Sequence, residues 1–164
     1  MPHPHHRQDA AVVACAVLTI SDTRTSDDDT SGHTIRRLLS DAGHRVESYS
    51  IVRDEPTAIT WAIRTAPAEV VISNGGTGIA LRDTTYEAVK GMLDKEISGF
   101  GELFRMLSFQ QIGAAAMMSR AIAGVAGRRI VFSLPGSTAA VELGMSQLIL
   151  PQLGHVVGLV RGGS

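Results

Sequence analysis

Apolar and polar positions along the chain follow the periods of strands and helices in turn. Residues 11–20 form an unbroken apolar run rich in valine, which is typical of a strand buried on both faces of a parallel sheet. Residues 33–42 carry apolar side chains at the i, i+3, i+4 and i+7 positions of an amphipathic helix, and Gly43 follows as a stop signal. The pattern therefore predicts a strand followed by a helix.

The same alternation continues as far as residue 72. Residues 46–52 alternate as a second strand, Pro56 opens a second helix, and residues 69–72 form a third apolar strand. A β-α-β-α-β order requires parallel strands joined by right-handed crossovers. The first half of the chain is therefore predicted to build a parallel α/β sheet.

The second half gives fewer periodic signals, and no repeat, linker or second domain is visible. We therefore expect residues 11–164 to form one domain. The predicted elements are a helix from Thr84 to about Lys95, an aromatic, glycine-bearing turn over 99–105, a buried helix from Met106 to about Ile122, a strand over 130–134, a long helix from Pro135 to about Leu150 and a short strand over 156–160.

Composition places the chain among ordinary globular domains. Its 164 residues are 44% apolar and 19% charged, and the net charge of −1 provides no general attraction for nucleic acids or membranes. No apolar run approaches the ~20 residues of a membrane span. Cys15 is the only cysteine and lies within an apolar strand, so we expect a buried core residue in a cytoplasmic protein. The polar, proline-broken residues 1–10 are expected to form a disordered tail rather than a metal site.

A glycine loop, Gly75-Gly76-Thr77-Gly78, stands where the third strand ends and a helix is about to begin. This order builds anion sites at the carboxyl edge of parallel sheets, because glycines let the backbone approach a phosphate and adopt positive φ. Pro135-Gly136-Ser137 follows a similar strand, and loops at the carboxyl ends of parallel strands share one edge. Each loop could be an ordinary tight turn, but together they predict a shared phosphate-binding crevice.

Asp83 is the residue that most strongly indicates chemistry. An aspartate at this place could cap the next helix, but Thr84 and Glu87 already have the spacing of a capping box. The Asp83 carboxylate would then lie outside the helix. A carboxylate beside a phosphate loop repels the ligand unless a divalent cation lies between them, so Asp83 is interpreted as a Mg²⁺ ligand.

Other charged residues at the same predicted edge allow two interpretations each. Asp54 and Asp22 follow the second and first strands and could bind a metal or act in acid–base catalysis, although Asp54 could equally cap the second helix. Arg53 and Arg82 neighbour these carboxylates and could clamp phosphates. The triplet Asp27-Asp28-Asp29 could hold a cation, but the pattern favours a solvated loop that caps the following helix.

Several stretches, taken in order from roughly Val13 to Val156, carry a family resemblance. They are Ser21-Asp22, Asp29-x-Ser31-Gly32, Ser73-Asn74-Gly75-Gly76-Thr77-Gly78-Ile79 with Arg82-Asp83-Thr84 and Glu87-Ala88-Val89, Gly99-Phe100-Gly101-Glu102-Leu103-Phe104-Arg105, and Ser133-Leu134-Pro135-Gly136-Ser137. This set resembles the molybdopterin-binding domain of the MoaB/MogA family. Gly-Thr-Gly-Ile and the run from Met106 to Gly113 are closer to the MoaB branch.

The resemblance implies a three-layer αβα sandwich with a mostly parallel central sheet, assembled as a homotrimer or hexamer. It also implies a role in molybdenum cofactor biosynthesis and contact with the protein that inserts molybdenum. Active members of the family adenylylate molybdopterin: the terminal phosphate of the pterin attacks the α-phosphate of Mg-ATP, and pyrophosphate leaves.

Site residues follow from the same resemblance, position by position. Asp83 and Asp54 would act in catalysis through Mg²⁺. The phosphates would be cradled by Gly75, Gly76, Thr77 and Gly78, and the nucleotide or pterin pocket would be completed by Pro135, Gly136 and Ser137, with Ser21, Asp22 and Ser31 on its rim. Catalysis of this kind consists mostly of positioning and charge neutralisation, so it needs no side-chain nucleophile.

Three other functions remain open from the sequence. Some MoaB-type proteins bind the pterin without transferring an adenylyl group, and similar domains occur in pyrophosphatase-type hydrolases. A dinucleotide-binding domain has less support, because no glycine fingerprint with an acidic residue ~20 positions further on follows the first strand. The apolar residues 106–118 suit either a subunit interface or a core helix.

Overall fold

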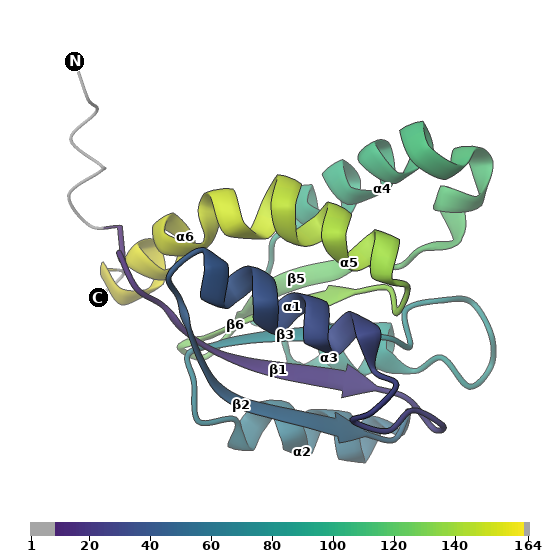
Figure 1. Cartoon of the computed structure of the whole chain (residues 1–164), viewed down its shortest axis with the longest axis horizontal. Helices are drawn as coiled ribbons and strands as arrows, with labels where there is room; N and C mark the ends of the chain where they lie inside the picture. Colours follow the sequence, from purple (N-terminus) through teal and green to yellow (C-terminus); the bar gives the residue numbers. More distant parts are fainter. Residues whose placement is uncertain (1–8, 163–164) are drawn as a thin grey trace.

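The computed structural model describes residues 9–162, which form a six-stranded sheet with helices on both faces (Figure 1). The strands are β1 (Ala14–Ile20), β2 (Arg45–Val52), β3 (Val70–Asn74), β4 (Lys95–Glu96), β5 (Ile122–Ala126) and β6 (Arg129–Leu134). Their order in the sheet is β2-β1-β3-β6-β5-β4. Pairs among β2, β1, β3 and β6 are parallel, whereas β5 pairs antiparallel with both β6 and β4. The predicted αβα sandwich with a mostly parallel sheet is confirmed.

β1 and β3 lie in the middle of the sheet, where both faces are covered. This position suits their side chains, because nearly every residue of the two strands is buried. Cys15 of β1 is fully buried, as expected, and burial raises the pKa of its thiol to about 12. The thiol therefore stays protonated at neutral pH and is no nucleophile.

One face of the sheet is covered by α1 (Thr30–Asp41), α4 (Ser98–Ile112) and a long C-terminal helix (Figure 1). Ile35 and Leu39 of α1 and Phe104 of α4 pack here against β1, β3 and β6. Each such side chain contributes about 1.5–3 kcal/mol through burial. This larger core fixes the helices that begin at the carboxyl edge of the sheet.

The opposite face is covered by α2 (Pro56–Thr65) and α3 (Thr85–Met92). Ile59 and Ile63 of α2 and Val89 of α3 pack against Leu18 and Val71 of the sheet. The β-α-β-α-β order predicted for the first half of the chain is confirmed, with helices on alternate faces. Every loop that leaves a parallel strand therefore emerges at one edge of the sheet.

The predicted turn over 99–105 is wrong, because these residues form the first half of α4. Glycines at 99 and 101 suggested a turn, but packing decides the structure instead. A Cβ at Gly101 would lie 2.7 Å from the carbonyl oxygen of Ala121, so this glycine lets α4 approach the sheet. Phe100 and Phe104 are buried by that approach.

The predicted buried helix from Met106 to about Ile122 is also wrong. α4 ends at Ile112, a 3₁₀ helix, η2, covers Gly113–Met118, and Ile122 already belongs to β5. Most of the large apolar side chains of this segment point outward: Met117, for example, is 79% exposed. The exposed set on α4 and η2, called the α4–η2 face below, is Leu103, Met106, Phe109, Ile112, Met117 and Met118.

The hairpin of β5 and β6 was only half predicted. β6 corresponds to the expected strand over 130–134, and Gly127 makes the turn with a φ of +62°. β5 was missed because its alanines and glycine, in Ile122-Ala123-Gly124-Val125-Ala126, lack the bulky side chains typical of strands. Only a glycine fits at position 124, because a Cβ there would lie 2.4 Å from the carbonyl oxygen of Lys95 in β4.

The C-terminal helix runs further than predicted. It is continuous through α5 (Thr138–Gly144), a π-helical turn η3 (Met145–Ile149) and α6 (Leu150–Gly162), so the short strand expected over 156–160 is wrong. The sequence predicts no membrane span, but the 25 residues from Thr138 to Gly162 are long and apolar enough to cross a membrane by length and composition alone. Met145, Ile149, Leu153 and Val157 of this helix are instead buried in the larger core.

The tail expected over residues 1–10 falls largely on residues 1–8, which lie outside the described part of the chain. Ala10 lies along α6, where its N–H donates to the carbonyl oxygen of Gly154 at 2.9 Å. The Asp9 carboxylate lies 2.8 Å from Nδ1 of His155.

Candidate functional site

The glycine loop (residues 75–78) begins where β1, β3 and β6 end together. Gly75 has a φ of +101°, and its N–H donates to the carbonyl oxygen of Leu134 at 3.0 Å. A Cβ on Gly75 would lie 2.2 Å from the carbonyl oxygen of Ile20, so only glycine fits between these strand ends. A Cβ on Gly136 would in turn lie 3.3 Å from Gly75 Cα. The two predicted glycine junctions therefore lie against each other.

Gly76 is held against the start of α3. Its φ is +70°, and its carbonyl oxygen accepts a hydrogen bond from the Thr85 N–H at 3.1 Å. A Cβ here would lie 2.1 Å from the Thr85 hydroxyl and 2.6 Å from Asp54 Oδ2. The Thr85 hydroxyl is buried and has no hydrogen-bond partner within residues 9–162. The glycine thus lets polar side chains approach the loop closely.

The backbone N–H groups of Gly76, Thr77 and Gly78 donate to no acceptor in the described part of the chain. Successive N–H groups of this kind, in a turn built on positive φ, form a concave anion site. This geometry suits the phosphate cradle that the sequence predicts, and the cradle stays a prediction.

Asp54 joins the ends of two crossover units. Its Oδ1 accepts hydrogen bonds from the Thr84 N–H at 3.0 Å and the Thr84 hydroxyl at 2.6 Å, and its own N–H donates to Asp22 Oδ1 at 3.0 Å. The alternative in which Asp54 caps α2 is wrong, because Glu55 occupies that N-cap and makes no side-chain cap bond. Asp54 Oδ2 points toward Gly76.

Asp83 closes the exposed loop that follows the glycines, called the 78–83 loop below. Its Oδ2 accepts a hydrogen bond from the Ala80 N–H at 3.1 Å, and a Cβ on Gly78 would lie 2.7 Å from the same oxygen. The half-buried carboxylate therefore lies beside the glycine loop, and its second oxygen, Oδ1, accepts no hydrogen bond from the described residues.

The predicted capping box of Thr84 and Glu87 is wrong. Thr84 does occupy the N-cap position of α3, but its hydroxyl donates to Asp54 instead of accepting from the helix. The Glu87 carboxylate pairs with Arg120, and this hydrogen bond lowers the pKa of Glu87. Both side chains are used to attach α3 to neighbouring segments.

The remaining predicted rim residues lie around the same edge. The Ser31 hydroxyl donates to the carbonyl oxygen of Gly136 at 2.7 Å, and Ser137, after Pro135, caps α5 by accepting from the Ala140 N–H at 3.2 Å. The Ser21 hydroxyl accepts from the Arg24 N–H at 3.0 Å, so it shapes its own turn. Arg53 and Arg82 are exposed.

Below the loops lies a buried polar network that the sequence analysis missed. Asp29 is the favoured helix cap, accepting from the Gly32 N–H at 3.0 Å, but it is fully buried rather than solvated. Its Oδ2 accepts from the Thr19 hydroxyl at 2.6 Å and the Tyr49 hydroxyl at 2.5 Å, and Asn74 Nδ2 donates to Thr19. The network ties β1, β2 and β3 to α1 directly beneath the site.

Charge and hydrogen bonding explain the pKa values in this network. Burial favours the neutral form of Asp29, but the hydrogen bonds from Thr19, Tyr49 and Gly32 and the charge of Arg24 outweigh burial, so the pKa of Asp29 is lowered. Burial and the hydrogen bond to Asp29 raise the pKa of Tyr49 to about 12. Asp29 is therefore an anion and Tyr49 a neutral donor at neutral pH.

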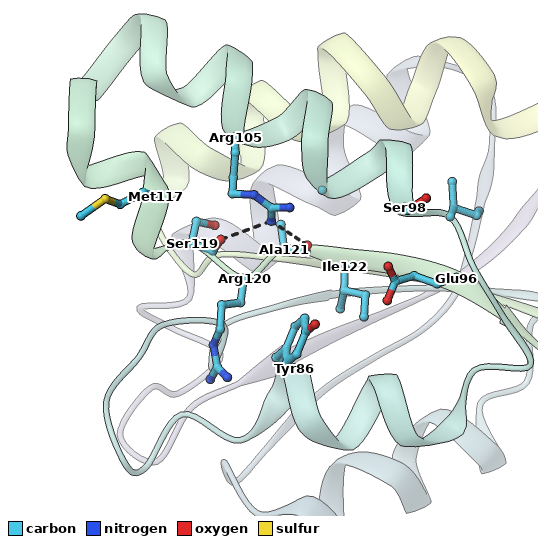
Figure 2. A pocket seen from close by; sticks show the side chains of 11 residues that line it. Tyr86, Glu96, Ser98, Arg105, Met117, Ser119, Arg120, Ala121 and Ile122 are labelled. Carbon is cyan, nitrogen blue, oxygen red and sulfur yellow. Dashed lines mark hydrogen bonds between the residues drawn. The ribbon is translucent and has the colours of Figure 1, made fainter.

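A second missed feature is a cavity of about 280 Å³ between α3, α4 and β5 (Figure 2). Figure 2 shows Arg105 reaching into it from α4 and Tyr86 from α3. Arg105 Nη1 donates to the carbonyl oxygen of Ser119 at 3.3 Å, and the Ser119 hydroxyl is buried without a partner in the described chain. Arg120 also lines the cavity and donates to the carbonyl oxygen of Gly78, so the cavity lies next to the glycine loop.

The metal ligands predicted at this edge are carboxylates. Residues 9–162 contain no group of three or more His, Cys, Asp or Glu side chains that could hold a metal ion on its own. Mg²⁺ in nucleotide sites needs only one or two carboxylates together with water and substrate phosphates. Asp54 and Asp83 each offer one oxygen without a hydrogen-bond partner among these residues, so this donor set fits Mg²⁺ bound through a nucleotide.

Comparisons with known proteins match nearly the whole chain. Residues 16–155 match the family described as "Probable molybdopterin binding domain". The chain is 54% identical over 158 residues to Molybdenum cofactor biosynthesis protein B of Halalkalibacterium halodurans, covering 93% of both chains. It is similar to a crystal structure of Molybdenum cofactor biosynthesis protein B, with a TM-score of 0.88, 52% identity and coverage of 91% of this chain and 96% of that one.

A further similar structure is that of the tungsten cofactor synthesizing protein MoaB from Pyrococcus furiosus. The TM-score is 0.78 and the identity 39%, and the match covers 92% of this chain and 98% of that one. The family match over residues 16–155 includes the glycine loop, Asp54 and Asp83.

Proposed function

Because the chain belongs to the family of molybdopterin-binding domains, within its MoaB branch, we propose that it binds molybdopterin and adenylylates it with Mg-ATP. The resemblance of the motifs is thereby confirmed, and a role in molybdenum cofactor biosynthesis follows from the family. The observation that carries the finer proposal is the phosphate cradle with two carboxylates beside it: free N–H groups at Gly76, Thr77 and Gly78, and open oxygens on Asp54 and Asp83.

The glycine loop and the two carboxylates would bind different parts of the magnesium-bound triphosphate. The N–H groups of the glycine loop would bind phosphate oxygens, while Asp54 and Asp83 would hold Mg²⁺, which supplies charge neutralisation on the phosphates when bound. Thr84 keeps Asp54 in place through Oδ1, and the Ala80 N–H keeps Asp83 in place through Oδ2. Each carboxylate is thus oriented by one oxygen and can bind through the other.

The cavity between α3, α4 and β5 would take the pterin. Tyr86 offers an aromatic ring, Arg105 a guanidinium group and Ser119 an unpartnered hydroxyl, which together suit a flat, polar ring system. Since Arg120 lines this cavity and also contacts the glycine loop, a pterin bound here would have its phosphate near the triphosphate.

The reaction then requires only positioning and charge stabilisation. A phosphate oxygen of molybdopterin forms a bond to the α-phosphorus of ATP, and the bond from that phosphorus to the bridging oxygen of the β-phosphate breaks. Pyrophosphate leaves with the electron pair of the broken bond. The attacking phosphate is already ionised at neutral pH, so the chain needs no general base.

The test is pyrophosphate release from Mg-ATP by the purified chain, with and without molybdopterin. We expect release only when molybdopterin is present, and a loss of at least about 100-fold in Asp83→Asn, which keeps the bond from Ala80 but removes the charge. Asp41→Asn is the matched control, since Asp41 pairs with Arg37 on the exposed side of α1. Release without molybdopterin would indicate a hydrolase, and tight pterin binding without release would indicate a binding protein.

The α4–η2 face supports a further part of this proposal, assembly with other copies of the chain. Phe109, Ile112 and Met117 are each at least 60% exposed and lie on consecutive segments, so together they form an apolar surface rather than scattered positions. We propose that this surface is covered in the homotrimer or hexamer that the family resemblance implies. Sedimentation of Ile112→Glu should show monomers where the unchanged chain sediments as an oligomer; unchanged sedimentation would place the interface elsewhere.

A contact with the protein that inserts molybdenum, and a location in the cytoplasm, belong to the same proposal. The fully buried Cys15 suits a reducing and an oxidising compartment equally, so it does not bear on the location of the protein. Both parts therefore depend on the molybdenum cofactor role, which the pyrophosphate assay tests.

A further inference from the structure

Arg120 fastens the 78–83 loop at both ends. Its Nε and Nη2 donate to the carbonyl oxygen of Gly78 at 2.9 and 2.6 Å, and Nη2 also donates to the carbonyl oxygen of Asp83 at 3.2 Å. Its backbone N–H donates to the carbonyl oxygen of Thr77 at 3.0 Å. One residue from the segment before β5 therefore holds the end of the glycine loop and the residue that would bind Mg²⁺.

The guanidinium group is itself held in place. Nη1 pairs with the Glu87 carboxylate, and the guanidinium carbon lies 5.0 Å from the centroid of the Tyr86 ring. The side chain is only 26% exposed, so its hydrogen bonds are partly shielded from water. Glu87 and Tyr86 of α3 therefore hold the Arg120 guanidinium in place, and the guanidinium in turn holds the 78–83 loop.

Little else constrains the loop between these two attachments. Ile79 is 67% exposed and Leu81 fully exposed, so their side chains bury almost no surface against the molecule. The bond from the Ala80 N–H to Asp83 is internal to the loop and does not attach it to the sheet. On its other side Asp83 is followed by Thr84 and Thr85, which are bonded to Asp54 and Gly76, so Arg120 is the side chain that joins the loop's own two ends, Gly78 and Asp83.

We propose that Arg120 is a positioning residue that sets the distance between the phosphate cradle and the Asp83 carboxylate. The ligand named in its test rests on the proposed function, whereas the effect on the loop does not. Lysine would keep the charge but could not donate from two nitrogens to Gly78 while also reaching Asp83, because it lacks the planar fork. The geometry of the guanidinium, and not its charge alone, is therefore required.

The experiment compares Arg120→Ala and Arg120→Lys with the unchanged full-length chain. Amide hydrogen exchange of residues 78–84 reports the loop without any ligand, and calorimetry reports the affinity for Mg-ATP. Both are repeated with guanidinium chloride at tens of millimolar, far below the molar range that unfolds domains. Arg161→Ala is the matched control, since Arg161 pairs with Glu69 away from the site.

We expect Arg120→Ala to lose protection in residues 78–84 and to bind Mg-ATP about tenfold more weakly, as the loss of charge-assisted hydrogen bonds implies. Added guanidinium should restore most of the lost protection and most of the lost Mg-ATP affinity. Arg120→Lys should resemble Arg120→Ala in both measurements. Arg161→Ala should change neither the protection nor the affinity. General destabilisation could not produce this pattern, because guanidinium does not rescue an unstable fold.

Two results would overturn the inference. One is unchanged loop exchange in Arg120→Ala, and the other is full recovery by Arg120→Lys, which would show that charge suffices. If the unchanged chain does not bind Mg-ATP, the proposed function fails. The exchange measurements, with and without guanidinium, then still decide the role of Arg120.

Discussion

The parallel strands β2, β1, β3 and β6 and the antiparallel pair β5 and β4 contribute to the site in different ways. The parallel part supplies backbone groups and carboxylates at strand ends, and close contacts hold them: Gly75 leaves no room for a Cβ beside Ile20. The segments around β5 supply long side chains instead, Arg120 and Arg105, which act through hydrogen bonds. The glycine loop is thus held by close backbone contacts on the first side and by side-chain hydrogen bonds on the second.

The largest expected effect comes from comparing a glycine of the parallel part, Gly75, with the turn glycine of the β5–β6 hairpin, Gly127. Gly75→Ala should lower the free energy of unfolding by about 3 kcal/mol, because positive φ and a contact with the Ile20 carbonyl oxygen act together. Gly127→Ala also has positive φ, but its Cβ would meet nothing within 4 Å, so about 1 kcal/mol is expected. Urea unfolding measures both; equal losses would remove the contrast between the two parts.

Asp29→Asn tests whether the network under the parallel strands is needed for stability. Asp29 accepts through both carboxylate oxygens, from Thr19 and Tyr49 on Oδ2 and from Gly32 on Oδ1, but the amide nitrogen of asparagine donates and does not accept, so a loss of about 2 kcal/mol at pH 7 is expected. The pKa of Asp29 is lowered in the folded chain, so between the folded and unfolded values the unfolded chain binds more protons. The contribution of Asp29 is therefore complete above the unfolded value of about 3.9 and lost as the pH falls through the folded one.

The check on Asp29 is a series of urea unfolding curves across that pH range. The difference between Asp29→Asn and the unchanged chain should shrink as the solution becomes more acidic. A difference that stays constant down to the lowest pH would mean that the charge of Asp29 is not what the network uses.

A smaller effect is expected from the buried hydroxyl pair between β3 and β6. The Ser73 and Ser133 hydroxyls lie 2.8 Å apart on adjacent parallel strands. Ser73→Ala should cost about 1 kcal/mol because it leaves the Ser133 hydroxyl unpaired, and Ser73→Ala with Ser133→Ala together should cost less than the sum. Thermal unfolding of the three variants measures the coupling, and strict additivity would show that the pair does not interact.

The smallest effect should come from the exposed end of the Arg120 contacts. Glu87→Gln removes an ion pair whose carboxylate is 58% exposed, so no more than about 0.5 kcal/mol of stability is expected to be lost. The midpoint of thermal unfolding of Glu87→Gln should nearly equal that of the unchanged chain. A loss as large as that of Gly75→Ala would show that the Arg120 contacts stabilise the chain as strongly as the packing of the glycine loop.

The parallel part was largely predictable from the sequence, because its signals are local. The apolar run of β1 and the glycines at 75 and 76 follow from period and residue type, without knowledge of distant partners. The proximity of the two glycine junctions also followed, since carboxyl ends of parallel strands share an edge. Asp54 was placed correctly at that edge, but its partner Thr84 is 30 residues away and was assigned to a capping box.

The rest could not be read from local patterns. Gly101 suggested a turn, and the segment around Gly124 gave no strand signal, but each glycine lies where another chain segment passes close to it. Arg120 belongs to a chain rich in arginines, and only its partners at Gly78 and Asp83 distinguish it from Arg82. The buried state of Asp29 depends on Tyr49 from another strand, a contact that no spacing within the triplet indicates.

The separation along the chain between the glycine loop and its fastening has a consequence for biosynthesis. Gly78 and Arg120 are 42 residues apart, so the loop leaves the ribosome well before the residue that shapes it. The crossover units that carry Asp22, Asp54 and the glycines can dock on one another while Arg120 is still being translated. A nascent chain that stops short of Arg120 would thus carry the glycine loop without the side chain that joins Gly78 to Asp83.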